Sequence, residues 1–333
     1  MLGIIYTTHI GKMNKNILIL GGGGFIGGHL AKRLKSEGNW VRVADIKDEP
    51  SFFKKEDICD HYVSLDLRHA YDVDVAFAGE EWDEVYNLAA DMGGAGYIFT
   101  GENDSDIMIN SLRINCNIID NLNSRCKRFF YSSSACIYPQ QNQTNPNKNT
   151  TEESTAYPAN PDSEYGWEKL ISERLYLAAK RNKNITIRIA RYHNVYGPYG
   201  AFNDGKEKAP AALCRKAIEG DNEIEIWGDG KQTRSFLYIE DCVDATIKFM
   251  RQDNFCGPIN IGSEQMVTIN GLAYAVIKIS GKDLKVKHID GPLGVRGRNS
   301  HNKLIYKLLK WKPKYTLIEG LKPTYEWIKK QVS

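Results

Sequence analysis

Tyr165 and Lys169 lie in the segment SEYGWEKLISE as a Y-x-x-x-K pair. Helical spacing of this kind places the two side chains on one face. An ammonium group beside a phenol favours the phenolate, which lowers the pKa of the tyrosine and lets it act as a general base near neutral pH. The pair therefore predicts abstraction of a proton from a substrate.

Two further reactive side chains lie in SSSACIYP (132–139), after a run that is typical of a strand. In an extended segment residues i and i+2 point the same way, so we expect Ser134 and Cys136 to face one side together. Ser134 can hydrogen-bond a substrate hydroxyl beside Tyr165, and Cys136 adds a thiol. We expect this segment at the carboxyl edge of a sheet, where such folds present groups to a ligand.

The elements that must position these residues are short apolar strands alternating with helical stretches. The strands are expected at 16–20, 40–45, 61–65, 84–89, 128–133 and 185–190. Continuous apolar strands indicate a parallel sheet that is covered on both faces. After Arg191 this alternation breaks up at Gly/Pro-rich turns, and 259–262 is expected to return to the sheet.

We therefore predict an α/β protein with a doubly wound parallel sheet and a smaller, discontinuous C-terminal domain that binds the substrate. The sheet domain is expected at 13–190 plus about 237–262, and the smaller domain at about 191–236 plus 263–333. Regular pattern begins at Asn16, so Met13 is an alternative start to Met1. The polar, Asn-rich segment 140–154 is expected to be an exposed loop.

A glycine turn follows the first expected strand. Gly21, Gly24 and Gly27 form G-x-x-G-x-x-G, and Phe25 and Ile26 begin the next helix. A strand that leads into a glycine turn and a helix amino terminus is a pyrophosphate cradle, so the turn predicts a dinucleotide cofactor.

Acidic and apolar residues after the next strands are expected to complete the cofactor site. Asp45 ends the second strand, where a carboxylate accepts both ribose hydroxyls and repels a 2′-phosphate, which favours NAD over NADP. Lys47 weakens that preference. Asp66 and Leu67 after the third strand are expected to flank the adenine, and Leu88 after the fourth is also assigned to the cofactor site.

Composition excludes several classes of protein. The 333 residues include 44 Lys+Arg and 41 Asp+Glu, a net charge of +3, which gives no reason to expect nucleic acid or an anionic membrane as a partner. Seven scattered cysteines show no metal-ligand spacing and predict neither a disulfide framework nor a metal site. The amino terminus does not have the pattern of a signal peptide, so we expect a cytoplasmic protein.

Taken together, these motifs resemble the extended short-chain dehydrogenase/reductase superfamily, Rossmann-fold enzymes that oxidise and re-reduce nucleotide sugars with retained NAD. Within it, the chain is similar to the GDP-mannose 3,5-epimerases from about Gly21 to Trp327. Besides SSSACIYP, the segments that carry this likeness are NLAADMGGAG, RYHNVYGP, KEKAPAALCRKA, WGDGKQTRSF and GPLGVRGRNS. The segment GYIFTGENDSD (96–106) and the Asn-rich loop depart from the plant enzymes at positions that can shape the rim of the pocket.

The resemblance implies transient oxidation of the sugar at C4, which acidifies the protons at C3 and C5. It implies that Cys136 and Lys208 form an acid/base pair on opposite faces of the sugar. It also implies cations for the diphosphate of a GDP-sugar and polar contacts to the substrate. The cations are Lys216, Arg234 and Arg298, with Arg296 as a further candidate, and the polar contacts are Asn194, Gln232 and the Gly93-Gly94 backbone. The resemblance also implies a homodimer, in which the helical stretch 106–122 and the helix that carries Tyr165 and Lys169 form the interface.

Of four alternative functions, one stays fully open, namely action on another GDP-sugar, and the residues argue against the other three. Another GDP-sugar, such as a heptose, is a possible substrate, and the ratio of C5-only to C3,C5 inversion is not fixed by sequence. A 4,6-dehydratase would carry an Asp-Glu pair where this chain has Ala135-Cys136. A UDP-galactose-type C4 epimerase needs no second acid/base pair. A non-catalytic NAD-binding sensor has no need of Ser134, Tyr165 and Lys169 together.

Overall fold

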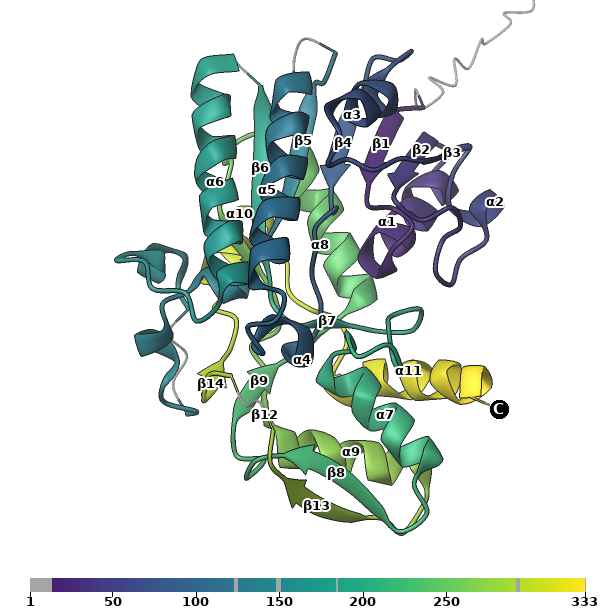
Figure 1. Ribbon diagram of the computed structural model, residues 1–333, viewed down its shortest axis with the longest axis vertical. Coiled ribbons are helices and arrows are strands. Elements are labelled where there is room, and N and C mark those ends of the chain that lie inside the picture. Colours follow the sequence, from purple (N-terminus) through teal and green to yellow (C-terminus); the bar gives the residue numbers. More distant parts are fainter. Residues whose placement is uncertain (1–13, 123–124, 148–150, 184, 292–293, 333) are drawn as a thin grey trace, which may run out of the picture.

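The computed structural model describes residues 14–332 except 123–124, 148–150, 184 and 292–293, so Met13 lies outside the described residues. At its centre is a seven-stranded sheet with the order β11-β6-β5-β4-β1-β2-β3 (Figure 1). All its pairings are parallel. In chain order the strands are β1 (Asn16–Leu20), β2 (Trp40–Asp45), β3 (His61–Ser64), β4 (Glu84–Asn87), β5 (Arg128–Ser134), β6 (Thr186–Tyr192) and β11 (Ile259–Ile261). The predicted α/β fold class is confirmed.

Helices cover both faces of this sheet, which explains why an inner strand such as β1 is apolar and buried from Ile17 to Leu20. In β1, Ile17 and Ile19 pack toward one face, while Leu18 and Leu20 pack toward the other. The first face is covered by α1 (Phe25–Ser36) and α8 (Ile239–Arg251), and the second by α3 (Ala70–Phe77), α5 (Asp104–Asn121) and α6 (Glu164–Lys183). Alternate residues of each strand therefore enter two separate cores.

The smaller part of the molecule, lower in Figure 1, is built from later segments of the chain. Its helices α7 (Ala209–Glu219), α9 (Ile269–Ser280) and α11 (Leu317–Val332) pack together, and β8 (Glu223–Trp227) pairs with β13 (Lys285–Ile289). A three-stranded sheet joins β12 (Met266–Thr268), β9 (Thr233–Ser235) and β14 (Gly297–Arg298). This small sheet brings residues near 234 and 298 side by side.

Short elements connect these layers. They include helices α2 (Lys55–Ile58), α4 (Ala95–Ile98) and α10 (Lys303–Leu309), and the paired strands β7 (Val195–Tyr196) and β10 (Leu237–Tyr238). Three 3₁₀ turns, η1 (Ala135–Ile137), η2 (Gln140–Gln143) and η3 (Glu153–Ala156), follow the fifth sheet strand. They carry the chain from the edge of the sheet to the start of α6.

The Asn-rich segment 140–154 differs from the prediction of a uniformly exposed loop. Gln143 and Thr151 are each only 1% exposed. Gln143 accepts a hydrogen bond from Arg298, and Thr151 donates to the backbone carbonyl of Asn299. The polar composition of this segment therefore reflects buried hydrogen bonds to the 298–299 segment as well as contact with water.

Candidate active site

The glycine turn after β1 has the shape of a phosphate cradle. Gly21 has a φ of +80°, and a Cβ atom there would lie 2.6 Å from the Ala89 backbone nitrogen. A Cβ atom on Gly27 would collide with the Gly21 carbonyl oxygen, whereas one on Gly24 would meet only that oxygen, at 3.6 Å. Gly24 caps α1 without a side-chain hydrogen bond. The free amino end of α1 and the open space beside Gly24 fit a bound pyrophosphate.

Asp45 lies beside this turn. Its Oδ2 accepts a hydrogen bond from the Gly23 backbone nitrogen (2.8 Å), and its Oδ1 accepts one from Lys47 (3.1 Å). An ionised carboxylate offers about four lone-pair positions, so each oxygen retains capacity for a ribose hydroxyl. These residues fit the predicted NAD site.

The other predicted cofactor residues occupy different surroundings. Asp66 forms an ion pair with Arg68 (2.6 Å), and this hydrogen bond lowers the pKa of Asp66. Leu67 is buried, and Leu88 is half-buried directly after β4. Phe25 and Ile26 are half-buried at the start of α1 and pack against its core. The Asp66 carboxylate is therefore engaged with a neighbouring arginine.

Tyr165 and Ser134 meet where β5 ends and α6 begins. Tyr165 is 7% exposed, and a hydrogen bond links its hydroxyl to Ser134. The Lys169 ammonium lies 5.6 Å from the centroid of the Tyr165 ring and 3.6 Å from Glu168 Oε2. The structure thus brings the three predicted residues together and adds a buried carboxylate to them.

The electrostatics of Tyr165 differ from the sequence prediction that Lys169 lowers its pKa. Burial raises the pKa of Tyr165, and the nearby charges of Cys136 and Glu168 raise it further, while the hydrogen bond with Ser134 lowers it. The main physical reason is burial, which disfavours the ionised phenol; the buried Glu168 carboxylate, 3.6 Å from the Lys169 ammonium, adds a negative charge. The site therefore favours the protonated tyrosine.

Cys136 lies at the centre of the site. Its backbone nitrogen donates to Ser134 Oγ (3.1 Å), and its side chain packs in one cluster with Tyr165 and residues of α4. Arg298 Nη1 donates to the Cys136 sulfur at 3.0 Å. The predicted diphosphate ligand Arg298 is therefore in direct contact with the predicted acid/base thiol.

Lys208 approaches from the other part of the molecule, as the residue that caps α7. Burial lowers the pKa of Lys208, and the charge of Cys136 raises it. The chain before Lys208 packs against the Gly93-Gly94 turn, where a Cβ atom on Gly94 would collide with the Glu207 carbonyl oxygen. The glycine turn therefore fixes how closely the Lys208 segment approaches the sheet edge.

The other predicted substrate residues are Arg234, Gln232, Lys216, Asn194 and Arg296. Arg234 is paired in register with Arg298 across β9 and β14, and burial followed by the charge of Arg298 lowers the pKa of Arg234 to about 10. Gln232 Oε1 is buried with no hydrogen-bond partner among the described residues. Lys216 donates to the Glu225 carbonyl (2.8 Å), Asn194 to the Ser235 carbonyl (3.0 Å), and Arg296 forms an ion pair with Asp229.

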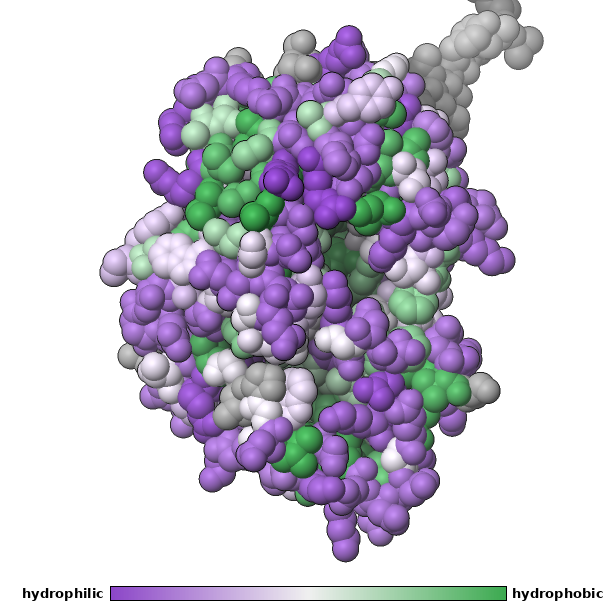
Figure 2. Space-filling model, in the orientation of Figure 1, coloured by the Kyte–Doolittle hydropathy of each residue, from purple (hydrophilic) through white to green (hydrophobic). Residues whose placement is uncertain are grey.

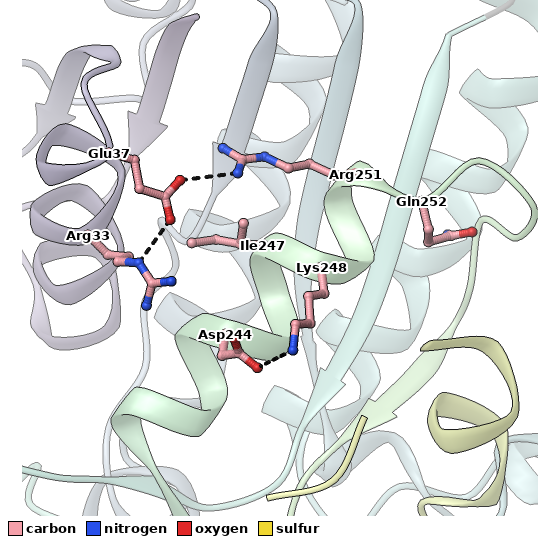
Figure 3. A pocket seen from close by; sticks show the side chains of 7 residues that line it. All are labelled: Arg33, Glu37, Asp244, Ile247, Lys248, Arg251 and Gln252. Carbon is pink, nitrogen blue, oxygen red and sulfur yellow. Dashed lines mark hydrogen bonds and ion pairs between the residues drawn. The ribbon is translucent and has the colours of Figure 1, made fainter. Parts of the chain in front are cut away.

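A separate hollow of about 410 Å³ lies between the carboxyl ends of α1 and α8 (Figure 3). Its charged groups pair with one another: Glu37 with Arg33 and Arg251, and Asp244 with Lys248. The carboxyl end of α1 is at the amino edge of the sheet, and the predicted site residues lie at the carboxyl edge. This hollow is therefore distinct from the candidate active site.

Comparison with known families agrees with this geometry. Residues 17–262 match the sequence model of the NAD dependent epimerase/dehydratase family. The chain belongs to this family. It is 45% identical to GDP-mannose 3,5-epimerase of Arabidopsis thaliana over 320 aligned residues. The alignment covers 96% of this chain and 83% of the relative. The chain is 30% identical over 318 residues to UDP-glucuronic acid decarboxylase 5 of the same plant, covering 93% and 88%.

Solved structures of the family are similar along nearly the whole chain. UDP-glucuronic acid 4-epimerase from Bacillus cereus, solved with UDP-glucuronic acid and NAD, has a TM-score of 0.81 and 27% identity, covering 96% of this chain and 100% of that one. UDP-glucose 4-epimerase from Thermotoga maritima, solved with UDP-glucose, has a TM-score of 0.81 and 26% identity with the same coverage. NAD is the cofactor of this family.

Three site residues were missed by sequence reasoning: Glu168 beside Lys169, and Asp162 and Gln143 beside Arg298. Glu168 lies inside the Y-x-x-x-K segment, so its position next to Lys169 was the available signal. Gln143 and Asp162 contact Arg298 from distant parts of the chain, and no local sequence pattern indicates such contacts.

None of the helices in the described part of the chain is long and apolar enough to cross a membrane.

Proposed function

We propose that the protein catalyses the NAD-dependent epimerisation of GDP-mannose at C3 and C5, giving GDP-L-galactose and GDP-L-gulose. The observation that carries this proposal is the position of Cys136. It packs beside Tyr165 and within electrostatic reach of Lys208, so groups suited to oxidation and groups suited to inversion lie near one another. The 45% identity to a GDP-mannose 3,5-epimerase over 96% of the chain supports the choice of substrate.

Oxidation at C4 is assigned to Ser134, Tyr165 and Lys169. Hydride acceptance and return at C4 are the chemistry that NAD supplies when bound. Ser134 and Tyr165 hydrogen-bond the C4 hydroxyl, and Tyr165 takes its proton and later returns it. Lys169 orients this end of the site through its position over the Tyr165 ring.

Inversion is assigned to Cys136 and Lys208. Once C4 is a ketone, the protons on C3 and C5 are acidic, and one group removes a proton while the other delivers a proton to the opposite face. Burial lowers the pKa of Lys208 and so brings this amine closer to the range in which it exchanges protons. Gln232 and Asn194 contact the substrate, and Lys216 and Arg234 bind its diphosphate.

The identity of the sugar depends on the rim of the pocket. Tyr97 of α4 donates to Asp91 (2.8 Å), and Lys206 lies 4.0 Å from the centroid of the Tyr97 ring. These contacts join the 96–106 segment to the chain that carries Lys208. Epimerisation of another GDP-sugar, such as a GDP-heptose, is therefore the second candidate function, because this rim is the part that departs from the plant enzymes.

The test is incubation with GDP-mannose and a panel of GDP- and UDP-sugars, with products read by proton NMR. We expect inversion at C5 and C3 of GDP-mannose without net consumption of NAD. Conversion of a different GDP-sugar alone would replace GDP-mannose as the substrate. A protein that binds NAD but introduces no deuterium from solvent into any of these sugars would be a sensor rather than an enzyme.

We also propose a homodimer formed by α5 and α6. Figure 2 shows hydrophobic residues gathered over these two neighbouring helices. Ile109 of α5 is 45% exposed and Ile171 of α6 is 37% exposed. A symmetric pairing of this face with a second copy would bury both side chains. Sedimentation of the protein and of an Ile109→Lys, Ile171→Lys variant tests this assembly.

We place the protein in a reducing compartment, the cytoplasm. All seven cysteines are free thiols. Disulfides are rare in the cytoplasm, where thiols are kept reduced, and Cys136 needs its thiol for the proposed chemistry. Fractionation of the source cells with an antibody against the protein tests this location.

A further inference from the structure

The guanidinium group of Arg298 is held by three side chains from distant segments. Nε donates to Gln143 Oε1 (2.5 Å), Nη1 to the Cys136 sulfur (3.0 Å) and Nη2 to Asp162 Oδ2 (2.9 Å). The side chains of Arg298 and Asp162 are only 6% and 4% exposed. Every nitrogen of this guanidinium therefore has a protein partner, and its orientation is fixed before any substrate binds.

The direction of the hydrogen bond to Cys136 is decided by chemistry. A guanidinium group has donors and no acceptor, so the sulfur must accept. Hydrogen bonds are strongest when the acceptor is ionised, and a thiolate accepts better than a thiol. A fixed Arg298 therefore keeps a charged hydrogen-bond donor against the Cys136 sulfur, the atom that is proposed to remove a proton from carbon.

Other charged and polar groups also face Cys136. Lys208 from the cap of α7 and Arg234 from β9 each interact electrostatically with Cys136, as does Tyr165 of α6. Asp162 is the carboxylate that balances part of this charge, through its ion pair with Arg298. The guanidinium groups of Arg298 and Arg234 and the ammonium group of Lys208 are thus cations near this site. They face the Asp162 carboxylate and the Cys136 sulfur.

We propose that Gln143 and Asp162 are positioning residues that hold Arg298 against Cys136, so that Arg298 assists proton transfer at the sugar carbon and not only diphosphate binding. The inference rests on the proposed function for the reaction it assists, but the effect on thiol reactivity requires no sugar. Gln143 belongs to η2 and Asp162 to the segment before α6, so two otherwise unassigned loops gain a role in the site.

One inversion consists of two proton transfers on opposite faces of the sugar. The Cys136 thiolate takes the proton from the carbon beside the C4 ketone, and the electron pair of that C–H bond forms an enolate. The enolate carbon then takes a proton from the Lys208 ammonium on the opposite face. Cys136 is left as a thiol and Lys208 as an amine, and exchange of protons with water restores both.

The first experiment measures alkylation of Cys136 by iodoacetamide as a function of pH, read by mass spectrometry of the Cys136 peptide, in NAD-loaded protein without sugar. Gln143→Met removes one anchor of Arg298 without changing charge, and Asp162→Ala removes the other. We expect alkylation at pH 7 to fall about tenfold in each, because the sulfur loses its fixed hydrogen-bond donor. Asp162→Asn keeps an oxygen acceptor and is expected to restore most of the reactivity.

The Asp162 variant separates positioning from charge alone. If Asp162 acted only through its charge, its removal would leave the cations less balanced and would make Cys136 more reactive. Faster alkylation of Asp162→Ala, or a parental profile in Gln143→Met, would therefore overturn the proposal. Asp229→Ala is the matched control, because Asp229 pairs with Arg296, two residues from Arg298, at an exposed position. Its alkylation profile is expected to match the parent.

The second experiment follows the reaction in deuterated buffer with GDP-mannose. We expect Gln143→Met to form NADH in a single turnover at the parental rate, while deuterium entry at the carbons beside the ketone slows about tenfold at saturating sugar. A higher KM with an unchanged maximal exchange rate would assign Arg298 to diphosphate binding alone and contradict the proposal. If the parent enzyme does not convert GDP-mannose, the proposed function fails, and the alkylation result still decides the role of Gln143 and Asp162.

Discussion

Ser134, Tyr165 and Lys169, which we call the oxidation set, are held by one strand end and one helix. Cys136, Lys208 and Arg298, the inversion set, come together from the sheet edge, the cap of α7 and the short strand β14. The oxidation set therefore depends on the local geometry of one strand end and one helix, whereas the inversion set depends on how the smaller part of the molecule packs against the central sheet. A change in that packing would alter the second set and leave the first in place.

Tyr165→Phe should have the largest effect, because it blocks oxidation at C4 and inversion requires the ketone that this oxidation forms. Loss of a general base costs about 10²- to 10⁴-fold in rate. We expect transient NADH and inversion to fall together, as measured by absorbance at single turnover and by NMR. NADH formation at the parental rate with inversion abolished would place Tyr165 in the inversion set.

Cys136→Ala should separate the two sets. Tyr165, Lys169 and the cofactor site remain in place, so C4 oxidation continues, while proton exchange beside the ketone falls by about 10²-fold or more. The variant must first be shown to retain NAD and GDP-sugar. A well-folded Cys136→Ala enzyme that inverts C5 at the parental rate would make this thiol a packing residue.

Lys208→Ala should give a smaller and distinct defect. The Cys136 thiolate can still remove a proton and return it to the same face, so deuterium enters while inversion stops. We expect deuterium entry within about tenfold of the parental rate, because the remaining base is intact. Mass spectrometry of the recovered sugar, combined with NMR of its configuration, distinguishes the two outcomes. Inversion that persists would assign the second acid to another residue.

Asp45→Ala should weaken the binding of NAD without altering the residues of the oxidation set or the inversion set. Hydrogen bonds to a charged group contribute about 1.5–3 kcal/mol, so NAD affinity should fall by about ten- to a hundredfold and discrimination against NADP should relax. Calorimetry with NAD and NADP measures both. An unchanged preference for NAD would remove Asp45 from the ribose site.

The smallest effect is a shift of the pH profile. Tyr165 works as a base in its deprotonated form, and burial raises its pKa, so oxidation should rise with pH. Lys208 donates in its protonated form, and burial lowers its pKa, so inversion should fall as pH rises. Glu168→Gln removes a charge that raises the pKa of Tyr165, so the rising limb should move to lower pH while the falling limb stays. A shift of the rising limb to higher pH would contradict this assignment.

The strands and the oxidation set could be predicted because both follow local rules. Apolar runs such as NILIL form buried parallel strands, and Y-x-x-x-K places Tyr165 and Lys169 on one helical face. The effect of Glu168 on Tyr165 could not be predicted in the same way, because it depends on how deeply both side chains are buried. Burial is a property of the packed domain rather than of the segment.

The inversion set was predictable only through resemblance to a family. Nothing in the local sequence brings Gln143, Asp162 and Arg298 together, because these contacts span 155 and 136 positions of the chain. The polar composition around Gln143 predicted exposure, and composition alone cannot distinguish a side chain that meets water from one that meets a buried arginine.

The close approach of Gly94 to the Glu207 carbonyl makes this glycine a spacer between two parts of the chain. A side chain at position 94 has no room unless the segment that carries Lys208 moves away from the sheet edge. Ser134, Tyr165 and Lys169 lie on β5 and α6, outside that segment. A single methyl group at position 94 would therefore displace Lys208 while leaving those three residues in place.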